Sequence, residues 1–293
     1  MPAALAHLTW WQWLEPLPAG VNLVLMALYL YVTLGSGQRW FPGATRPRPR
    51  QVAAFLLGIF SVYLAFGGPL DILADGYLFS AHMAQHSIEA MASAPLLLLG
   101  TPDWLIRPVL KWRPTGWLLS HMVRPLIALL LFNVVFGLVV WPPLYALMEQ
   151  NGAVHFLVHA AILITALAMW WPLLSPLPEL PRLHPGLQLL YLFADGIPML
   201  LPFVLVILDS QPLYTAVYAH APRLFGLSLI GDQQLGGTLC LMTVHIAYGA
   251  AFIAAFQQWV RQERDKRVDP AIQRAREPIP FPQGRTGQAS VDA

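Results

Sequence analysis

Long apolar stretches alternate with shorter polar segments along most of the chain. Stretches of helix length fall at about residues 20–36, 52–72, 77–100, 123–144, 153–174, 187–208 and 236–259. A membrane-spanning helix needs roughly 17–25 mostly apolar residues, so the first stretch lies at the lower edge of that range. The pattern predicts an all-α, polytopic membrane protein with seven transmembrane helices embedded in the lipid bilayer.

The composition agrees with this pattern. Hydrophobic residues make up 57% of the 293 residues and charged residues 11%, whereas a typical soluble domain carries about 25% charge. The net charge is only +2, so we predict no nucleic-acid partner. The single cysteine, Cys240, excludes an intrachain disulfide and any paired-cysteine metal motif.

Basic residues are distributed unevenly between the predicted loops, and this sets an orientation. Every Lys and Arg except Arg223 falls after an odd-numbered span: Arg39, Arg46, Arg48, Arg50, Arg107, Lys111, Arg113, Arg124, Arg182, Arg261, Arg264, Lys266, Arg267, Arg274, Arg276 and Arg285. Cytoplasmic loops carry this excess, so the N-terminus is predicted outside and the C-terminus inside. We expect a membrane domain over residues 1–260 and a disordered cytoplasmic tail over residues 261–293.

Two histidine pairs with four-residue spacing lie in the third and fifth predicted spans. They are His82 with His86, and His155 with His159. Two residues four apart share one face of a helix, with about 5–6 Å between their Cβ atoms. Both pairs are predicted roughly 3–14 Å below the outer surface. Titratable side chains are costly in lipid, so two such pairs at one depth favour binding of a metal or cofactor over hydrogen bonding between helices.

Other polar side chains lie near these pairs or deeper in the membrane. Glu89 shares the face of His82 and His86, and we expect it to be protonated or held by a histidine or a cation. His245 falls in the same layer, as a ligand or as a buried hydrogen-bonding partner. Asn133 is expected to bond another helix, and Asp195 to pair with Arg182 or cap local backbone.

The residue types leave more than one site chemistry open. Neutral imidazole suits copper and zinc, and the sulfur atoms of Met83, Met91, Cys240 and Met242 would favour Cu(I). The alternative is a haem-binding membrane redox protein, with histidines from facing helices as axial ligands. Paired histidines argue against haem, because each helix would need only one. A membrane di-metal oxygenase is disfavoured, because such enzymes use more histidines at the cytoplasmic face.

Several motifs together resemble a known family. The segment Tyr77–His86, which reads YLFSAHMAQH, is followed by APLLLLGTP at 94–102. Further matches are Phe132-Asn133, the His155/His159 pair before Trp170-Trp171-Pro172, and DQQLGG at 232–237. The chain resembles, over about residues 50–255, the CtaG family of assembly factors for caa-type cytochrome c oxidases.

The resemblance implies a non-enzymatic assembly factor of the bacterial inner membrane, with copper as the expected ion and an oxidase subunit as the partner. Its periplasm-facing site would use His82, His86, His155, His159 and Asp232, the last orienting a histidine. Met83 or Cys240 would add a soft donor. After the DQQLGG motif the family usually has a Met-Trp pair, where this chain has Thr238-Leu-Cys240-Leu-Met242, so Cys240 or Met242 would take that role.

Overall fold

The computed structural model describes residues 9–276, with side chains through residue 266. This part of the chain is helical and contains no strand. The helices are α1 (Trp10–Trp13), α2 (Pro16–Leu34), α3 (Pro49–Phe66), α4 (Gly68–Ala74), α5 (Phe79–Ile88), α6 (Ala94–Gly100), α7 (Asp103–Lys111), α8 (Arg113–Met122), α9 (Pro125–Leu138), α10 (Pro142–Gln150), α11 (Gly152–Leu174), α12 (Pro185–Leu208), α13 (Thr215–Tyr218) and α14 (Leu229–Arg276). A 3₁₀ turn occupies Ser36–Trp40, and a π-helical turn, Glu89–Ser93, joins α5 to α6.

Proline explains where many of these helices begin. It occupies the first position of α2, α3, α9, α10 and α12. At this position a missing N–H costs nothing and the fixed φ angle already suits a helix. The Pro-rich segments between apolar stretches therefore act as helix starts as well as loops.

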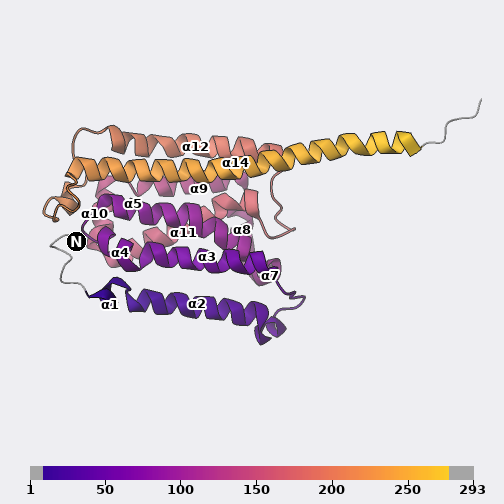
Figure 1. The fold of residues 1–293 in the computed structure, drawn as a ribbon, viewed down its shortest axis with the longest axis horizontal. Helices are drawn as coiled ribbons and strands as arrows, with labels where there is room; N and C mark the ends of the chain where they lie inside the picture. Colours follow the sequence, from indigo (N-terminus) through magenta and orange to yellow (C-terminus); the bar gives the residue numbers. More distant parts are fainter. Residues whose placement is uncertain (1–8, 277–293) are drawn as a thin grey trace, which may run out of the picture.

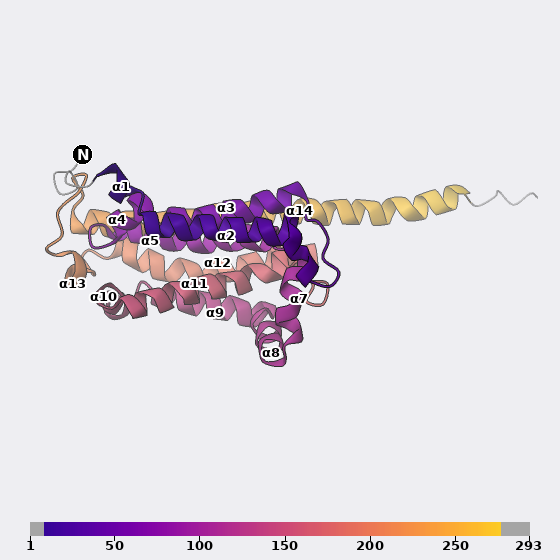
Figure 2. The ribbon, with the colours of Figure 1, turned by 90° about the horizontal axis from the view of Figure 1, so that it is seen from below.

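The long helices run side by side along the long axis of the molecule (Figure 1). They are α2, α3, α5, α9, α11, α12 and α14. The short helices α1, α4, α10 and α13 gather at one end of this bundle, and α7 and α8 lie at the other (Figures 1 and 2). The predicted loops rich in Lys and Arg fall at the α7/α8 end.

Within residues 9–276, five helices are long and apolar enough to cross a membrane. They are Pro16–Leu34, Pro49–Ala74, Gly152–Leu174, Pro185–Leu208 and Leu229–Lys266. The count becomes six if α8 and α9, which meet at a bend of 82°, form one span. The predicted third span, residues 77–100, is not among them, so the seventh crossing remains a prediction.

That third segment is different because it lies inside the bundle. It forms α5, the π turn and α6, and it packs on α3, α11 and α14. Its polar side chains, including those of Ser80, Gln85 and Ser87, are buried. In contrast, large apolar side chains such as Phe156 and Leu205 are exposed on the surrounding helices, as expected where a helix faces lipid.

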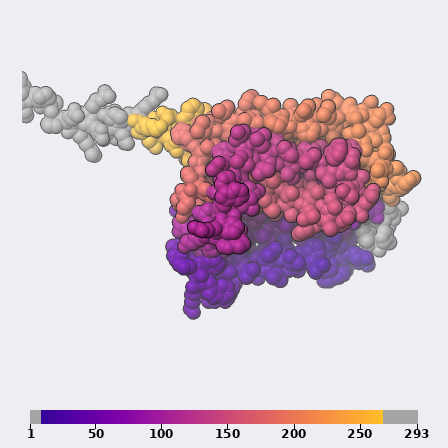
Figure 3. Space-filling view, turned by 180° about the vertical axis from the view of Figure 1, so that it is seen from behind, coloured from indigo at the N-terminus to yellow at the C-terminus, as the bar shows by residue number. Residues whose placement is uncertain are grey.

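Residues 261–276, which fall in the predicted tail, continue α14 as a helix through Arg276. This end of α14 projects beyond the bundle (Figure 3). Residues 257–266 are rich in Gln, Arg, Glu and Lys, which are strong helix formers. An ion pair of 2.8 Å between Lys266 Nζ and Glu263 Oε1 lies along this helix. The remainder of the predicted tail, 277–293, lies outside the described residues.

Candidate metal centre

The two histidine pairs meet inside the bundle. His82 and His86 come from α5, and His155 and His159 from α11. The ring centroid of His82 lies 4.6 Å from that of His86, 5.1 Å from that of His155 and 5.6 Å from that of His159. One nitrogen from each of His82, His155 and His159 lies within 4.8 Å of the other two. The four imidazoles therefore lie in one cluster, and three of them could hold a metal ion together.

One histidine of each pair lies against a buried carboxylate. Glu89 Oε2 is 2.9 Å from His159 Nδ1 and forms a hydrogen bond with it. Glu149 Oε1, on α10, is 2.9 Å from His82 Nδ1, in an ion-pair contact without hydrogen-bond alignment. The prediction that a histidine holds Glu89 is met by His159. Burial raises the pKa of Glu149, and the nearby His155 partly offsets this increase.

These contacts leave ring nitrogens facing one another in the interior. His82 Nε2 lies 3.1 Å from His86 Nε2. Two further nitrogens, His86 Nδ1 and His159 Nε2, are buried without a hydrogen-bonding partner. Buried polar atoms are almost always paired, so these nitrogens have unused capacity to bind a proton donor or a metal ion. The donor set fits a metal that prefers imidazole.

Aromatic rings enclose the cluster. Tyr145 lies 5.2 Å from His82 between ring centroids, and Phe66 lies 4.7 Å from His159. Tyr145 is fully buried, and its hydroxyl lies 2.5 Å from that of Tyr218. Neither Glu149 nor Tyr145 is among the residues that the sequence motifs single out. Their four-residue spacing on one short helix, just before His155, was the available signal.

Among the described residues, the hydrogen bonds of Asp232 go to the start of α5 and none reaches a histidine, so the predicted orienting role stays a prediction. Its Oδ2 accepts a hydrogen bond of 2.8 Å from the Phe79 backbone N–H, and its Oδ1 accepts one of 3.0 Å from that of Ser80. These are orphan donors of the first turn of α5, which a carboxylate satisfies while complementing the helix dipole. Asp232 thus fixes the start of the helix that carries His82 and His86.

The rest of the DQQLGG motif also positions α14 against its neighbours. Gln233 donates from Nε2 to the Val206 carbonyl at 3.0 Å and accepts from the Leu213 N–H at 2.7 Å. A Cβ on Gly236 would stand 2.6 Å from the Phe79 ring, so only glycine allows α14 to approach α5 this closely. The motif holds helices in place and supplies no imidazole or thiol to the site.

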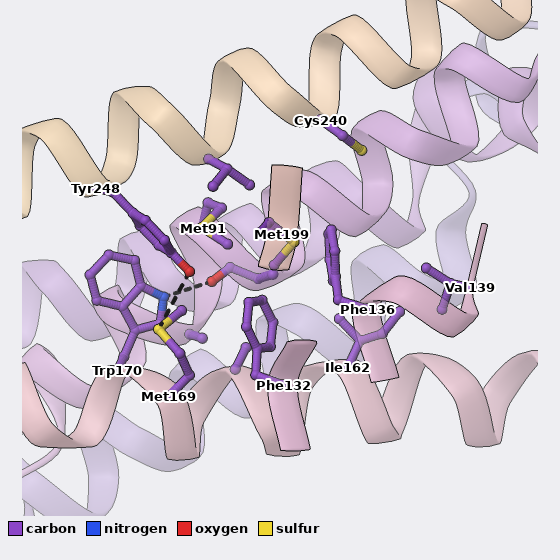
Figure 4. Close-up of a cluster of buried hydrophobic side chains, with 14 of the residues drawn as sticks. Met91, Phe132, Phe136, Val139, Ile162, Met169, Trp170, Met199, Cys240 and Tyr248 are labelled. Atoms are coloured by element: carbon purple, nitrogen blue, oxygen red, sulfur yellow. Dashed lines mark hydrogen bonds between the residues drawn. The ribbon is translucent and has the colours of Figure 1, made fainter. Parts of the chain in front are cut away.

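The predicted sulfur donors include Cys240, Met83 and Met242, whose surroundings the structure describes. Cys240 Sγ is 3.3 Å from the Met83 carbonyl and 3.2 Å from Ser87 Oγ, between α14 and α5. The Met83 side chain is fully buried in the hydrophobic core. Met242 points outward, with 57% of its side chain exposed. Figure 4 shows Cys240 and Met91 among apolar side chains of the core. In the described part of the chain, no hydrogen bond joins any of these sulfur atoms to the histidine cluster.

His245 lies on the outer surface of α14, and neither predicted role describes it. Its side chain is exposed, and its Nδ1 bonds the Leu241 carbonyl of its own helix at 2.6 Å. Its position one turn and a residue beyond Cys240 turns it away from α5.

A second buried polar cluster links three helices deeper in the bundle. Asn133 Nδ2 donates to Asp195 Oδ1 at 2.6 Å, and the Tyr248 hydroxyl donates to Asp195 Oδ2. The predicted interhelical bond of Asn133 is confirmed. The predicted Asp195–Arg182 pair is wrong, because Arg182 Nε donates instead to the Ser175 carbonyl at 3.0 Å.

An all-helical chain with several membrane-length helices and a buried histidine–carboxylate cluster defines a multi-pass membrane protein with a candidate metal centre. A family profile described as cytochrome c oxidase caa3 assembly factor (Caa3_CtaG) matches residues 27–262. The chain belongs to this family, which confirms the resemblance read from its motifs.

Two curated relatives are similar to this chain. They are an uncharacterized protein of Mycobacterium bovis and one of Mycobacterium tuberculosis, each 28% identical over 231 residues. The match covers 73% of this chain but 34% of each relative. The chain therefore spans about a third of the length of the curated relatives it matches. No solved structure matches the chain.

Proposed function

We propose that this protein is a non-enzymatic assembly factor for cytochrome c oxidase in the bacterial inner membrane. Copper is its cargo, held by His82, His86, His155 and His159. An oxidase subunit docked alongside in the membrane would receive the ion. Membership of the oxidase assembly family supports the oxidase as the partner, and the histidine cluster supports a metal ion as the cargo.

One observation carries the metal proposal. His82 and His159 each present Nδ1 to a buried carboxylate, which leaves Nε2 directed away from that carboxylate. Metal-binding histidines commonly have this arrangement, because the carboxylate fixes the ring and increases the basicity of the opposite nitrogen. Imidazole suits both copper and zinc, and the family's role in oxidase assembly favours copper.

The arrangement of the helices supports an extracytoplasmic site. We propose seven spans with the N-terminus outside and the C-terminus inside, α5–α6 being the third. The histidine pairs begin α5 and α11 at the end of the bundle that also carries α10. The Lys- and Arg-rich segments lie at the opposite end, which the positive-inside rule assigns to the cytoplasm.

The haem alternative is less favoured. Two axial histidines would have to direct a nitrogen at the iron from opposite faces of a porphyrin. The rings of His82 and His155 instead stack at 5.1 Å with an interplanar angle of 15°. Stacked rings at this separation leave no slot for a porphyrin between them, so a small ion fits the cluster better.

Copper retention by the purified full-length chain tests the proposal. The detergent-solubilised protein is loaded anaerobically with Cu(I), desalted and analysed for metal content and optical spectrum. We expect about one or two copper ions per chain, within the capacity of four imidazoles. The His82→Ala/His86→Ala variant should retain none.

A matched control is the His220→Ala/His245→Ala variant, which removes two exposed imidazoles and should retain copper as the wild-type chain does. Absence of copper from the wild-type chain would overturn the cargo proposal. A Soret band in the purified protein would instead support the redox alternative.

A further inference from the structure

A groove lies on the outer surface of the bundle, between α12 and α14. These two helices pack antiparallel along each other. The groove has a volume of about 400 Å³ and is lined from Leu192 to Leu200 on α12 and from Val244 to Phe252 on α14. Eight residue steps on each helix correspond to about 12 Å, or roughly two helical turns. Its lining is mostly apolar.

Two glycines keep the groove open at the level of the backbone. A Cβ at Gly196 would meet only the Tyr248 ring, at 3.9 Å, and a Cβ at Gly249 would meet nothing within 4 Å. No internal contact therefore explains the glycine at 249. Small residues on a membrane helix allow a second helix to approach its backbone closely, and here the space lies toward lipid.

Two side chains with polar atoms, His245 and Tyr248, line this apolar groove, and the Tyr248 hydroxyl bonds Asp195. His245 is the tenth residue of the predicted span 236–259, about 14 Å from its start, near the middle of a hydrocarbon core of about 30 Å. Its Nδ1 is bonded within α14. Among the described residues no partner is found for its Nε2. An exposed imidazole at this depth is costly unless another polar group reaches it.

We propose that this groove receives a transmembrane helix of the oxidase subunit. A hydroxyl, amide or carboxyl side chain of that helix would bond His245 Nε2. An acyl chain would fill the volume but has no polar group at mid-membrane depth, whereas a helix can supply one and can also use the open backbone at Gly249. The inference rests on the proposed function, because it takes the partner to be the oxidase that receives the copper.

The position of the groove relates docking to the metal centre. α14 packs on α5 as well as on α12, and Asp232 of α14 caps the start of α5. A client helix seated in the groove would therefore contact the helix that holds α5, and with it His82 and His86, in place. The groove and the metal-bearing helix α5 would then lie on different sides of α14.

Site-specific photo-crosslinking in living cells tests the docking. A benzophenone amino acid is placed at Ile197, in the groove, or at Val134, on α9. Both side chains are 58% exposed in the free chain, which makes Val134 a matched control. With an epitope-tagged oxidase subunit, we expect a tagged adduct from position 197 and none from position 134.

Two substitutions then separate docking from copper binding. Gly249→Leu should fill the groove and reduce the adduct at least tenfold, and His245→Leu should reduce it about threefold, as expected for one interhelical hydrogen bond in a membrane. Both purified variants should retain as much copper as the wild-type chain.

Equal adducts from positions 134 and 197, or an adduct unaffected by Gly249→Leu, would overturn the docking proposal. So would an adduct at position 197 that contains only lipid while the oxidase matures normally. Failure of the proposed function is seen separately, because it shows as a wild-type chain without copper.

Discussion

Two buried polar clusters lie in the same helix bundle, and they differ in how completely they satisfy their own hydrogen bonds. In the deeper one, both oxygens of Asp195 are bonded, by Asn133 and Tyr248, and only Asn133 Oδ1 lacks a partner. In the histidine cluster, His86 Nδ1 and His159 Nε2 are buried without partners. The first cluster joins α9, α12 and α14, whereas the second has nitrogen atoms available for something further.

The difference separates a structural role from a binding role. A buried polar group without a partner costs about 1–3 kcal/mol, and several in one place make the histidine cluster unfavourable unless a ligand compensates. Hydrogen bonding between helices accounts for both oxygens of Asp195. It does not explain why four imidazoles and two carboxylates converge with nitrogens unused.

Among residues that are not proposed as ligands, the carboxylates of the histidine cluster should have the largest effect on metal binding. Replacing Glu89 or Glu149 with glutamine keeps the shape but substitutes an amide for the carboxyl group that orients His159 or His82. We expect each change to weaken copper affinity about 10–100-fold, the usual effect of losing such a partner. Competition against a chelator of known affinity measures it.

Glu179→Gln serves as the control, because Glu179 pairs with Arg107 at the surface. Wild-type affinity in both the Glu89 and Glu149 variants would show that the carboxylates do not orient ligands.

The Asp195 cluster should affect stability and not copper. Asp195→Ala removes the acceptor of Asn133 Nδ2 and of the Tyr248 hydroxyl, and should destabilise the protein by about 1–3 kcal/mol. Asp195→Asn keeps one acceptor oxygen and should cost less. The thermal unfolding midpoint in detergent reports the change. Loss of copper from folded Asp195→Ala protein would contradict the separation of the two clusters.

Asp232 should affect both properties, but modestly. Asp232→Ala leaves the first N–H groups of α5 without their acceptor and should cost about 1 kcal/mol, typical of a lost helix cap. Copper affinity should fall less than in the Glu89 variant, because Asp232 acts only by positioning α5. The same unfolding and competition measurements apply. A loss of affinity equal to that of His82→Ala would instead indicate direct ligation.

Cys240 should have the smallest effect. Its sulfur contacts the Met83 carbonyl and Ser87, so Cys240→Ala should leave the copper content unchanged. Met242→Leu, at an exposed position, is the companion variant. A loss of copper from Cys240→Ala would restore the soft donor that the sequence suggested.

Hydropathy and local spacing determined a large part of this protein. The apolar stretches predicted the long helices, and proline marked where several begin. The four-residue spacing placed His82 with His86, and His155 with His159, on single helix faces. These features are readable from sequence because they depend on residues within one or two turns of each other.

Only the tertiary structure decided which faces meet. The rotation of α5 and α11 about their axes brings the two histidine pairs together, and α10 adds Glu149 from a segment whose own sequence is not distinctive. The close approach of α14 at Gly236 puts Asp232 on the start of α5 and Cys240 against the Met83 carbonyl and Ser87. Spacing along one helix cannot fix such contacts, because they depend on how neighbouring helices pack.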